Sequence, residues 1–415
     1  SMNSAFYFGG VVAALAVLAA LIAVPRGPPS DLVLRSTLRP LHRLADYHRS
    51  AAWWSVEETE ATLQLRGRIA IVTGGSSGIG KAIALGLYRR GATVILTSRS
   101  LERATAAAAD LQKEAPASTR GEVEPMALDL AELSDVRRFV ARFSARHATL
   151  AYLVENAGAV VVNQSLTSDG FEPNFAGNYL GHYLLLRLLL PSLKASAAPA
   201  ARITATSSIA HWVHGAPLAS LLPGRSRGEE PVSIARRPLG LGELMEQYGN
   251  TKLMQIHMLF ELQRQLRDEG SAIAAIPVAP GLIATRMGRQ GRDAGTSAAP
   301  AGSGWFFSAF VNYAISAFMA LGQTPARGAQ TTLHALLAPS MAGRSADGFF
   351  LQPYYTPKHR QPPLLGGSDV ILHETFAQRL TWSPHLWIPH PDAHNATFGA
   401  ELWAQSAAAV GLPAA

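Results

Sequence analysis

Short runs of β-branched residues alternate with amphipathic stretches of helical length from about Leu65 onward. This alternation is typical of a parallel sheet flanked by helices, because each buried strand is followed by a helix that returns the chain across the sheet. We therefore predict one doubly wound α/β domain over residues 65–415. Strands are expected at residues 69–73, 93–97, 123–128, 152–154, 202–206, 272–278 and 349–352, and helices are expected to start near Gly78, Leu101, Ser134, Phe171 and Leu244.

Two segments depart from this alternation. Residues 288–321 begin with small residues and continue as an apolar run, which predicts a lid over a substrate site, with core packing or a second membrane contact as alternatives. Residues 357–394 are rich in proline and histidine and are predicted to form a late insertion. Its metal-type side chains fit no zinc spacing, so a solvated loop is expected; they are His385, His390, Asp392 and His394.

The N-terminal segment has the pattern of a membrane anchor. Residues 5–24 carry no charge and are almost wholly apolar, and about 20 such residues suffice to cross a bilayer as a helix. We predict an anchor at residues 1–25 and a juxtamembrane linker at 26–64 that lies in part along the interface. A cleaved signal peptide or a buried helix is the alternative. A signal peptide carries basic residues before its apolar core, whereas here Arg26, Arg35, Arg39, Arg43 and Arg49 follow it.

That charge placement predicts a cytoplasmic catalytic domain, because positive residues next to a span stay on the cytoplasmic side. A eukaryotic source would favour the endoplasmic reticulum or a lipid droplet. Composition narrows the chemistry further: with 48% hydrophobic and 16% charged residues the chain is expected to fold, and the lack of cysteine excludes disulfides and thiolate catalysis. The net charge of +7 comes without an aromatic-interleaved basic stripe, so nucleic-acid binding is not expected.

A glycine-rich loop follows the first predicted strand directly and opens a helix. Small residues there allow a pyrophosphate to approach the backbone, and the amide groups at the start of the helix meet its charge. This context favours a dinucleotide-binding loop over an ordinary tight turn. The candidate loop residues are Gly74, Ser76, Ser77, Gly78, Ile79, Gly80 and Lys81.

The ends of the next strands add candidate cofactor contacts. Arg99 ends the second strand, where an NAD site would place an acid, and with Lys81 it favours the 2′-phosphate of NADP(H); two solvated cations are the alternative. Asp129 and Leu130 follow the third strand and would flank the adenine, and the fourth strand leads into Asn156, Ala157 and Gly158. In isolation, each of the two segments after these strands, residues 127–130 and 155–158, would also make an ordinary turn.

A serine pair and a tyrosine–lysine pair supply candidate catalytic groups. Ser207 and Ser208 follow the fifth strand, and Tyr248 and Lys252 stand one helical turn apart. A lysine ammonium beside a tyrosine stabilises the phenolate, so we expect it to lower the tyrosine pKa and allow acid–base catalysis. An exposed helical pair is the alternative for these two residues alone.

Taken in order and spacing, these motifs resemble the short-chain dehydrogenase/reductase family, with a Rossmann-like fold. The stretches DGFE at 169–172, NYLGHYLL at 178–185 and YGNTKL at 248–253 are most similar to its retinol-dehydrogenase-like branch. The resemblance implies that Ser208 binds the substrate oxygen, Tyr248 exchanges its proton, Lys252 also holds the nicotinamide ribose and Asn178 supports a relay water. It further implies that the carboxamide end of the cofactor is covered by Pro280, Gly281, Ile283 and Thr285.

The sequence departs from the family at Glu155, which replaces a second Asn, and at Ala279, which replaces a His; we expect altered packing there. The sequence and the resemblance together predict an NADP(H)-dependent oxidoreductase that acts on a lipophilic alcohol or carbonyl, such as a retinoid, steroid, polyprenoid or fatty derivative. The resemblance also allows a homodimer. A non-catalytic nucleotide-binding membrane scaffold is the main alternative, and an NAD-linked dehydrogenase in an oxidising lumen is another. A non-catalytic scaffold would have no physical need for its four candidate catalytic residues together, Ser208, Tyr248, Lys252 and Asn178.

Overall fold

The computed structural model describes residues 64–118, 120–161, 166–196, 201–212, 241–281, 283, 324–338, 341, 350–351, 386–387 and 391–414. The predicted anchor, the linker up to residue 63, the lid and most of the late insertion lie outside these ranges, as does Thr285. Within them, no helix combines the length and the apolar character that a bilayer span requires.

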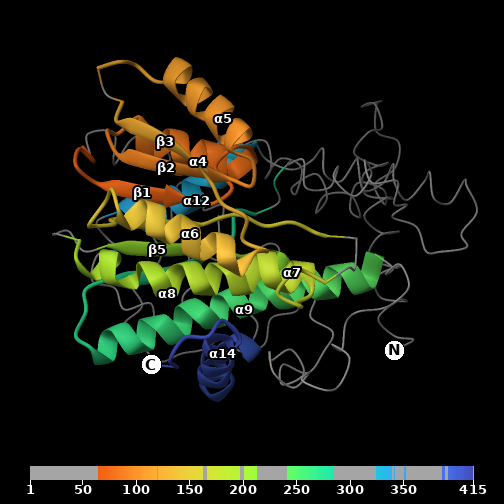
Figure 1. The fold of residues 1–415 in the computed structure, drawn as a ribbon. Helices are drawn as coiled ribbons and strands as arrows, with labels where there is room; N and C mark the ends of the chain where they lie inside the picture. Colours follow the sequence, from red (N-terminus) through yellow and green to blue (C-terminus); the bar gives the residue numbers. More distant parts are fainter. Residues whose placement is uncertain are drawn as a thin grey trace, which may run out of the picture.

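Eight strands and the helices between them follow the predicted alternation (Figure 1). The strands are β1 Ile69–Val72, β2 Thr93–Ser98, β3 Glu122–Ala127, β4 Tyr152–Glu155, β5 Arg202–Thr206, β6 Ala274–Val278, β7 Phe350–Leu351 and β8 Leu386–Trp387. The helices are α4 Gly78–Tyr88, α5 Leu101–Glu114, α6 Leu133–Ser144, α7 Pro173–Phe175, α8 Gly181–Lys194, α9 Leu241–Asp268, α12 Pro325–Leu337 and α14 Ala396–Ala409. Shorter helical segments are η1 Ala176–Leu180, which is π-helical, and the 3-10 turns η2 Ile209–Trp212 and η5 Pro391–His394.

The strands form one sheet in the order β3-β2-β1-β4-β5-β6-β7-β8. The pairs from β3 to β7 are parallel, and β8 joins β7 antiparallel. The chain order reverses between β1 and β4, and in open α/β sheets such a reversal opens a crevice at the carboxyl ends of the strands. The prediction of a doubly wound, Rossmann-like sheet is therefore confirmed.

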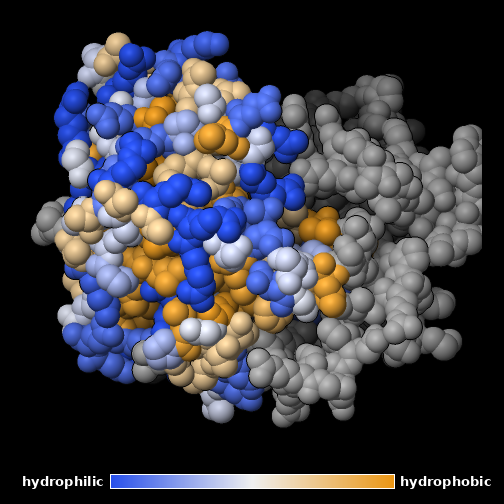
Figure 2. Space-filling view, viewed as in Figure 1, coloured by the Kyte–Doolittle hydropathy of each residue, from blue (hydrophilic) through white to orange (hydrophobic). Residues whose placement is uncertain are grey.

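Alternate residues of the central strand β1 face two separate cores. Ile71 faces a core formed with α6, α8, α9 and α14, whereas Ala70 and Val72 face a core formed with α4, α5 and α12. Because both faces of β1 are buried, this strand is apolar on both sides, as expected for the centre of a parallel sheet. In the view of Figure 1, hydrophobic residues are interspersed with hydrophilic ones on the surface and gather mainly in the lower half, over α8 and α9 (Figure 2).

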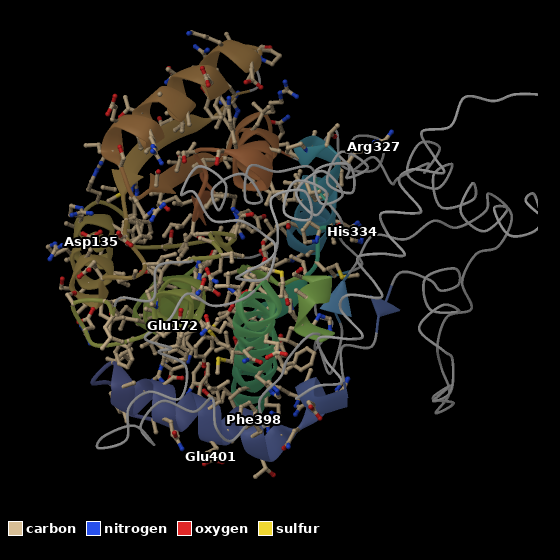
Figure 3. All side chains as sticks on the ribbon, turned by 90° about the vertical axis from the view of Figure 1, so that its right-hand side faces the viewer. Asp135, Glu172, Arg327, His334, Phe398 and Glu401 are labelled. Carbon is tan, nitrogen blue, oxygen red and sulfur yellow. The ribbon has the colours of Figure 1, made fainter. Side chains whose placement is uncertain are left out.

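Two helices and a strand were not predicted from the sequence. Helix α12 packs on α4, and Arg202 of β5 donates hydrogen bonds to the carbonyl oxygens of Ala335 and Ala338 at its end. Helix α14 packs against α9 on the other face of the sheet (Figure 3). The ring centres of Phe398 and His257 lie 4.8 Å apart there. Part of the late insertion, expected as a solvated loop, forms β8 and η5 instead.

The first turn of α8 lies directly against the turn after β3. A Cβ atom at Gly181 would lie 2.0 Å from the carbonyl oxygen of Leu130, so only glycine allows the two backbones to approach this closely. One turn earlier, a Cβ atom at Gly177 would have Ala131 Cβ as its nearest neighbour, at 3.8 Å. The approach of α8 to the sheet therefore depends on Gly181 and not on Gly177.

We expect Gly181→Ala to lower the free energy of unfolding by about 2–3 kcal/mol, because main chain must move to accept the methyl group. Gly177→Ala is the matched control and should be neutral or stabilising, because alanine favours helix over glycine. Urea denaturation of both variants, followed by circular dichroism, measures the difference. Equal stabilities would show that the backbones do not meet at Gly181.

Candidate active site

The loop after β1 forms a glycine-lined cradle at the carboxyl edge of the sheet. Gly74 and Gly78 have φ of 64° and 57°, in the left-handed region that favours glycine. A Cβ atom at Gly80 would lie 2.4 Å from the carbonyl oxygen of Gly74 and 2.5 Å from Asn156 Nδ2. The hydroxyl of Ser76 donates to that of Ser98, which ties the loop to the end of β2.

The hydroxyl of Thr73 joins the ends of β1 and β4 beneath this loop. It accepts hydrogen bonds from the main-chain N–H groups of Asn156 (2.8 Å) and Ala157 (2.9 Å), and Asn156 Nδ2 donates to Thr73 O at 3.0 Å. His182 Nε2 lies 3.1 Å from the same hydroxyl. Asn156 therefore fastens the two strand ends to each other.

Tyr248 and Ser208 meet at the carboxyl end of β5. Ser208 follows the strand and is half-buried, whereas Tyr248 is buried on α9. Burial raises the pKa of Tyr248 to about 12, and its hydrogen bond to Ser208 opposes that rise. The sequence predicted a pKa lowered by Lys252; in the structure, burial of the phenol decides the direction instead. Ser207 instead donates to the carbonyl oxygen of Lys252 at 2.8 Å and so holds α9 against β5.

Lys252 is fully enclosed beside this pair. Its ammonium donates to the carbonyl oxygen of Thr206 at 2.8 Å and to Gln255 Oε1 at 3.0 Å, and it lies 5.4 Å from the centre of the Tyr248 ring. Burial lowers the pKa of Lys252 to about 7. A Cβ atom at Gly158 would lie 3.2 Å from Nζ, so the ammonium faces the loop after β4.

Asn178 lies in the π-helical segment η1, a geometry that is frequent at functional sites. Its side-chain amide exchanges two hydrogen bonds with the main chain of Ala159, at 2.9 and 2.8 Å. Its main-chain oxygen accepts from Gln255 Nε2 at 2.8 Å and from His182 Nδ1 at 3.0 Å. Two side-chain donors therefore meet at this carbonyl oxygen, and the relay water that the resemblance implies for Asn178 stays a prediction.

Comparison with known proteins identifies this arrangement. The family model described as short chain dehydrogenase matches residues 68–220. Human polyprenol dehydrogenase is 31% identical over 322 residues, which cover 77% of this chain and 83% of that protein. Human retinol dehydrogenase 11 is 33% identical over 291 residues, 70% of this chain and 79% of that protein. The chain belongs to the short-chain dehydrogenase family. Within it the chain is part of the retinol-dehydrogenase-like branch, as predicted.

A solved structure supports the fold of this short-chain dehydrogenase over most of its length. A protein from Mycobacterium paratuberculosis, described only as uncharacterized, is 26% identical with a TM-score of 0.55. The match covers 87% of this chain and 99% of that one. Family membership makes the protein an oxidoreductase that uses a nicotinamide dinucleotide. The cradle fits such a group, because the bare glycines let the loop fold tightly against the start of α4, whose N-terminal main-chain N–H groups can donate to a pyrophosphate.

The charged residues that were predicted to contact the cofactor of the dehydrogenase differ in their exposure and in their partners. Arg99 is exposed at the end of β2. Lys81, expected to act with it, instead forms ion pairs with Asp110 (2.9 Å) and Glu114 (3.2 Å) on α5. Asp129 Oδ1 accepts from the N–H of Ala131 at 3.0 Å, so one carboxylate oxygen caps the turn after β3. Arg99 is thus the better placed cation for a 2′-phosphate.

The segment after β6 reaches the cradle through α12. Pro280 is buried, Gly281 has a φ of 81°, and Ile283 is buried against Gly328 of α12. A Cβ atom at Gly328 would also lie 3.5 Å from the side chain of Ile79, in the glycine loop. The structure thus brings the two predicted cofactor segments, 74–81 and 280–283, together on one helix.

The two departures from the family pattern are both buried. Ala279 packs in a small apolar cluster with Leu253, Ile256 and Ala393. Glu155 is fully buried at the end of β4, and its carboxyl oxygens have no hydrogen-bond partner among the described residues. Burial raises the pKa of Glu155 well above its ordinary range, which favours the neutral carboxyl. The altered packing expected at these positions, relative to the family, stays a prediction.

Sequence analysis missed three polar residues of the site. Thr73 was assigned to the end of a strand, His182 was used only as part of a family motif, and Gln255 was not noticed. Burial lowers the pKa of His182 to about 3, so the ring is neutral; Nδ1 carries the proton toward Asn178 O and Nε2 accepts from Thr73. The position of Gln255, three residues after Lys252 on one helix, was the signal available.

Lys252→Met should change stability in a pH-dependent way. The native pKa of about 7 is below the ordinary 10.5, so the unfolded chain binds a proton that the native protein lacks between these values. The free energy that folding loses by burying the charged lysine is therefore largest below pH 7, and it disappears as the pH rises toward 10.5. Relative to the parent, the variant should therefore gain about 4 kcal/mol more at pH 6 than at pH 10. Urea denaturation at both pH values measures this, and a pH-independent difference would contradict it.

Proposed function

We propose that the protein is an NADP(H)-dependent dehydrogenase that interconverts a lipophilic alcohol and its aldehyde or ketone. The observation that carries this proposal is the meeting of Ser208, Tyr248 and Lys252 at the same edge of the sheet as the tight glycine loop that opens α4. A bound nicotinamide supplies or accepts the hydride. The protein contributes a proton, a substrate contact and a fixed positive charge.

Each of the three side chains has a distinct role in this proposal. In the direction of reduction, the Tyr248 hydroxyl gives its proton to the oxygen that gains negative charge. Ser208 donates a hydrogen bond to the same oxygen and orients it. Lys252 favours the phenolate that remains, and its third N–H is available for the cofactor ribose because Thr206 and Gln255 use two.

The relatives support a lipophilic substrate. Two proteins that share about a third of their sequence with this chain are named for polyprenol and retinol. The predicted apolar lid at residues 288–321 would suit the same chemistry, and a substrate of this kind would reach an enzyme tethered to the bilayer by residues 5–24. We therefore include a membrane tether and a cytoplasmic catalytic domain in the proposal.

A homodimer, if it forms, would use a surface other than the α14 side of α9. Helix α14 covers that side of α9, and it also packs on the preceding segments: the Tyr179 hydroxyl lies 2.9 Å from that of Ser406, and the Tyr183 hydroxyl donates to the Trp403 carbonyl oxygen. The side of α9 beneath α14 is therefore already occupied within one chain.

Tyr248→Phe should reduce single-turnover reduction of a lipid aldehyde by about a thousandfold or more, because Tyr248 is the phenol that lies against Ser208 and Lys252 among the described residues. Ser208→Ala should lose about a hundredfold. Affinity for NADPH should change less than about twofold in both, because neither hydroxyl binds the pyrophosphate. Tyr179→Phe is the matched control: it removes another buried hydroxyl, and it should keep parental turnover. Near-parental turnover in Tyr248→Phe would show that the acid is elsewhere.

Arg99→Ala should weaken NADPH binding about tenfold or more and leave NADH binding within about twofold, because only NADPH carries the 2′-phosphate. Lys81→Ala should have the smaller effect, because its ammonium is paired with α5. Arg103→Ala removes an exposed arginine from the next helix and controls for net charge. Fluorescence titration gives the dissociation constants. Equal parental affinities for NADPH and NADH would argue against the NADP(H) assignment.

A further inference from the structure

Gln255 joins two groups of the site that no other described side chain connects. It is fully buried on α9, one turn after Lys252. Its Oε1 accepts from the Lys252 ammonium at 3.0 Å, and its Nε2 donates to the main-chain oxygen of Asn178 at 2.8 Å. A single amide therefore spans from the catalytic lysine to the π-helical segment η1.

The chemistry at the two ends permits only one orientation of this amide. An ammonium has hydrogens to donate and no lone pair, and a carbonyl has lone pairs and no hydrogen. The reversed amide would direct its NH₂ group at the ammonium and its oxygen at the carbonyl, so it would lose both hydrogen bonds in a buried site. The amide is consequently a directional link between Lys252 and Asn178.

The link continues from Asn178 toward the cofactor cradle. The Asn178 oxygen also accepts from His182 Nδ1, and His182 Nε2 lies 3.1 Å from the Thr73 hydroxyl. That hydroxyl receives the N–H groups of Asn156 and Ala157. The position of the lysine is thus coupled, through Gln255, to the two strand ends on which the glycine loop rests.

We propose that Gln255 is a positioning residue that fixes the Lys252 ammonium against the Asn178 carbonyl by direct hydrogen bonds. It acts through the lysine, touching neither substrate nor cofactor. The proposal rests on the proposed function, in which Lys252 favours the phenolate of Tyr248. Removal of the Oε1 acceptor destabilises the ammonium, so the lysine gives up its proton at lower pH and Tyr248 ionises at higher pH.

The test compares three variants of the full chain. Gln255→Met removes both hydrogen bonds at similar volume. Gln255→Glu keeps an acceptor for Lys252 and loses the donor to Asn178. Gln263→Met is the matched control, because Gln263 is a second buried glutamine of α9 whose side chain binds only the main chain, accepting from Ala275 N at 2.8 Å and donating to Ile273 O.

Two readouts are needed. The first is the pH profile of single-turnover oxidation of a lipid alcohol that the parent accepts, together with the affinity for NADPH. The second is the pKa of Lys252, followed by NMR on protein labelled with [15N]lysine. The second readout requires no turnover, so a parent without activity would contradict the proposed function while the Lys252 titration still decides the role of Gln255.

In Gln255→Met we expect the pKa of Lys252 to fall by about one pH unit, as the loss of one hydrogen bond to a charged group implies. The acidic limb of the oxidation profile should move to higher pH, with rate reduced about tenfold and NADPH affinity within about threefold. Gln255→Glu should return the limb to the parental pH or below it. Gln263→Met should lower thermal stability and leave both readouts unchanged.

Parental values of both readouts in Gln255→Met would overturn the proposal. So would an equal displacement in Gln263→Met, because that result would assign the effect to α9 as a whole. If Gln255→Met does not fold, Gln255→Glu decides the question: a parental pKa of Lys252 beside a new carboxylate would show that residue 255 does not contact the ammonium.

Discussion

The buried ammonium of Lys252 is the point at which β5, η1 and α9 are held together. It donates hydrogen bonds to the last carbonyl oxygen of β5 and to the side-chain oxygen of Gln255. The amide nitrogen of Gln255 in turn donates to the carbonyl oxygen of Asn178. Such a charge is costly to bury, and the lowered pKa of Lys252 expresses that cost. The fold tolerates the cost because packing in one large core holds the three segments in place, and the site gains a positive charge beside Tyr248.

Polar bonds and glycine packing complete the same edge of the sheet. The Thr73 hydroxyl closes the gap between β1 and β4, and the absence of side chains at Gly74 and Gly80 lets the glycine loop pack closely against Ala157 and against itself. Helix α12 then braces the loop from outside through Gly328, on which Ile79 and Ile283 converge. The cofactor end and the chemical end are therefore parts of one hydrogen-bonded and packed unit.

The sequence predicted the features that are local. Strand periodicity gave β1 to β6 closely, and the glycine loop, Ser208, Tyr248 and Lys252 came from short spacings. It did not indicate what distant residues decide: the ion pairs of Lys81 with α5, the hydrogen bond from Gln255 to the Asn178 carbonyl oxygen, and the burial that raises the pKa of Tyr248. The two-residue strand β8 and the helices α12 and α14 were missed because their ordering depends on packing against distant segments.

The most direct test of the central claim, that this buried cluster directs hydride transfer to a lipophilic carbonyl, is transfer of deuterium from NADPH deuterated at the transferable C4 position. Purified protein is incubated with this cofactor and with retinal or a polyprenal, and the alcohol product is examined by mass spectrometry. The account predicts an alcohol that carries a single deuterium on the former carbonyl carbon. Protein that binds NADPH and yields no deuterated alcohol from either aldehyde would contradict it.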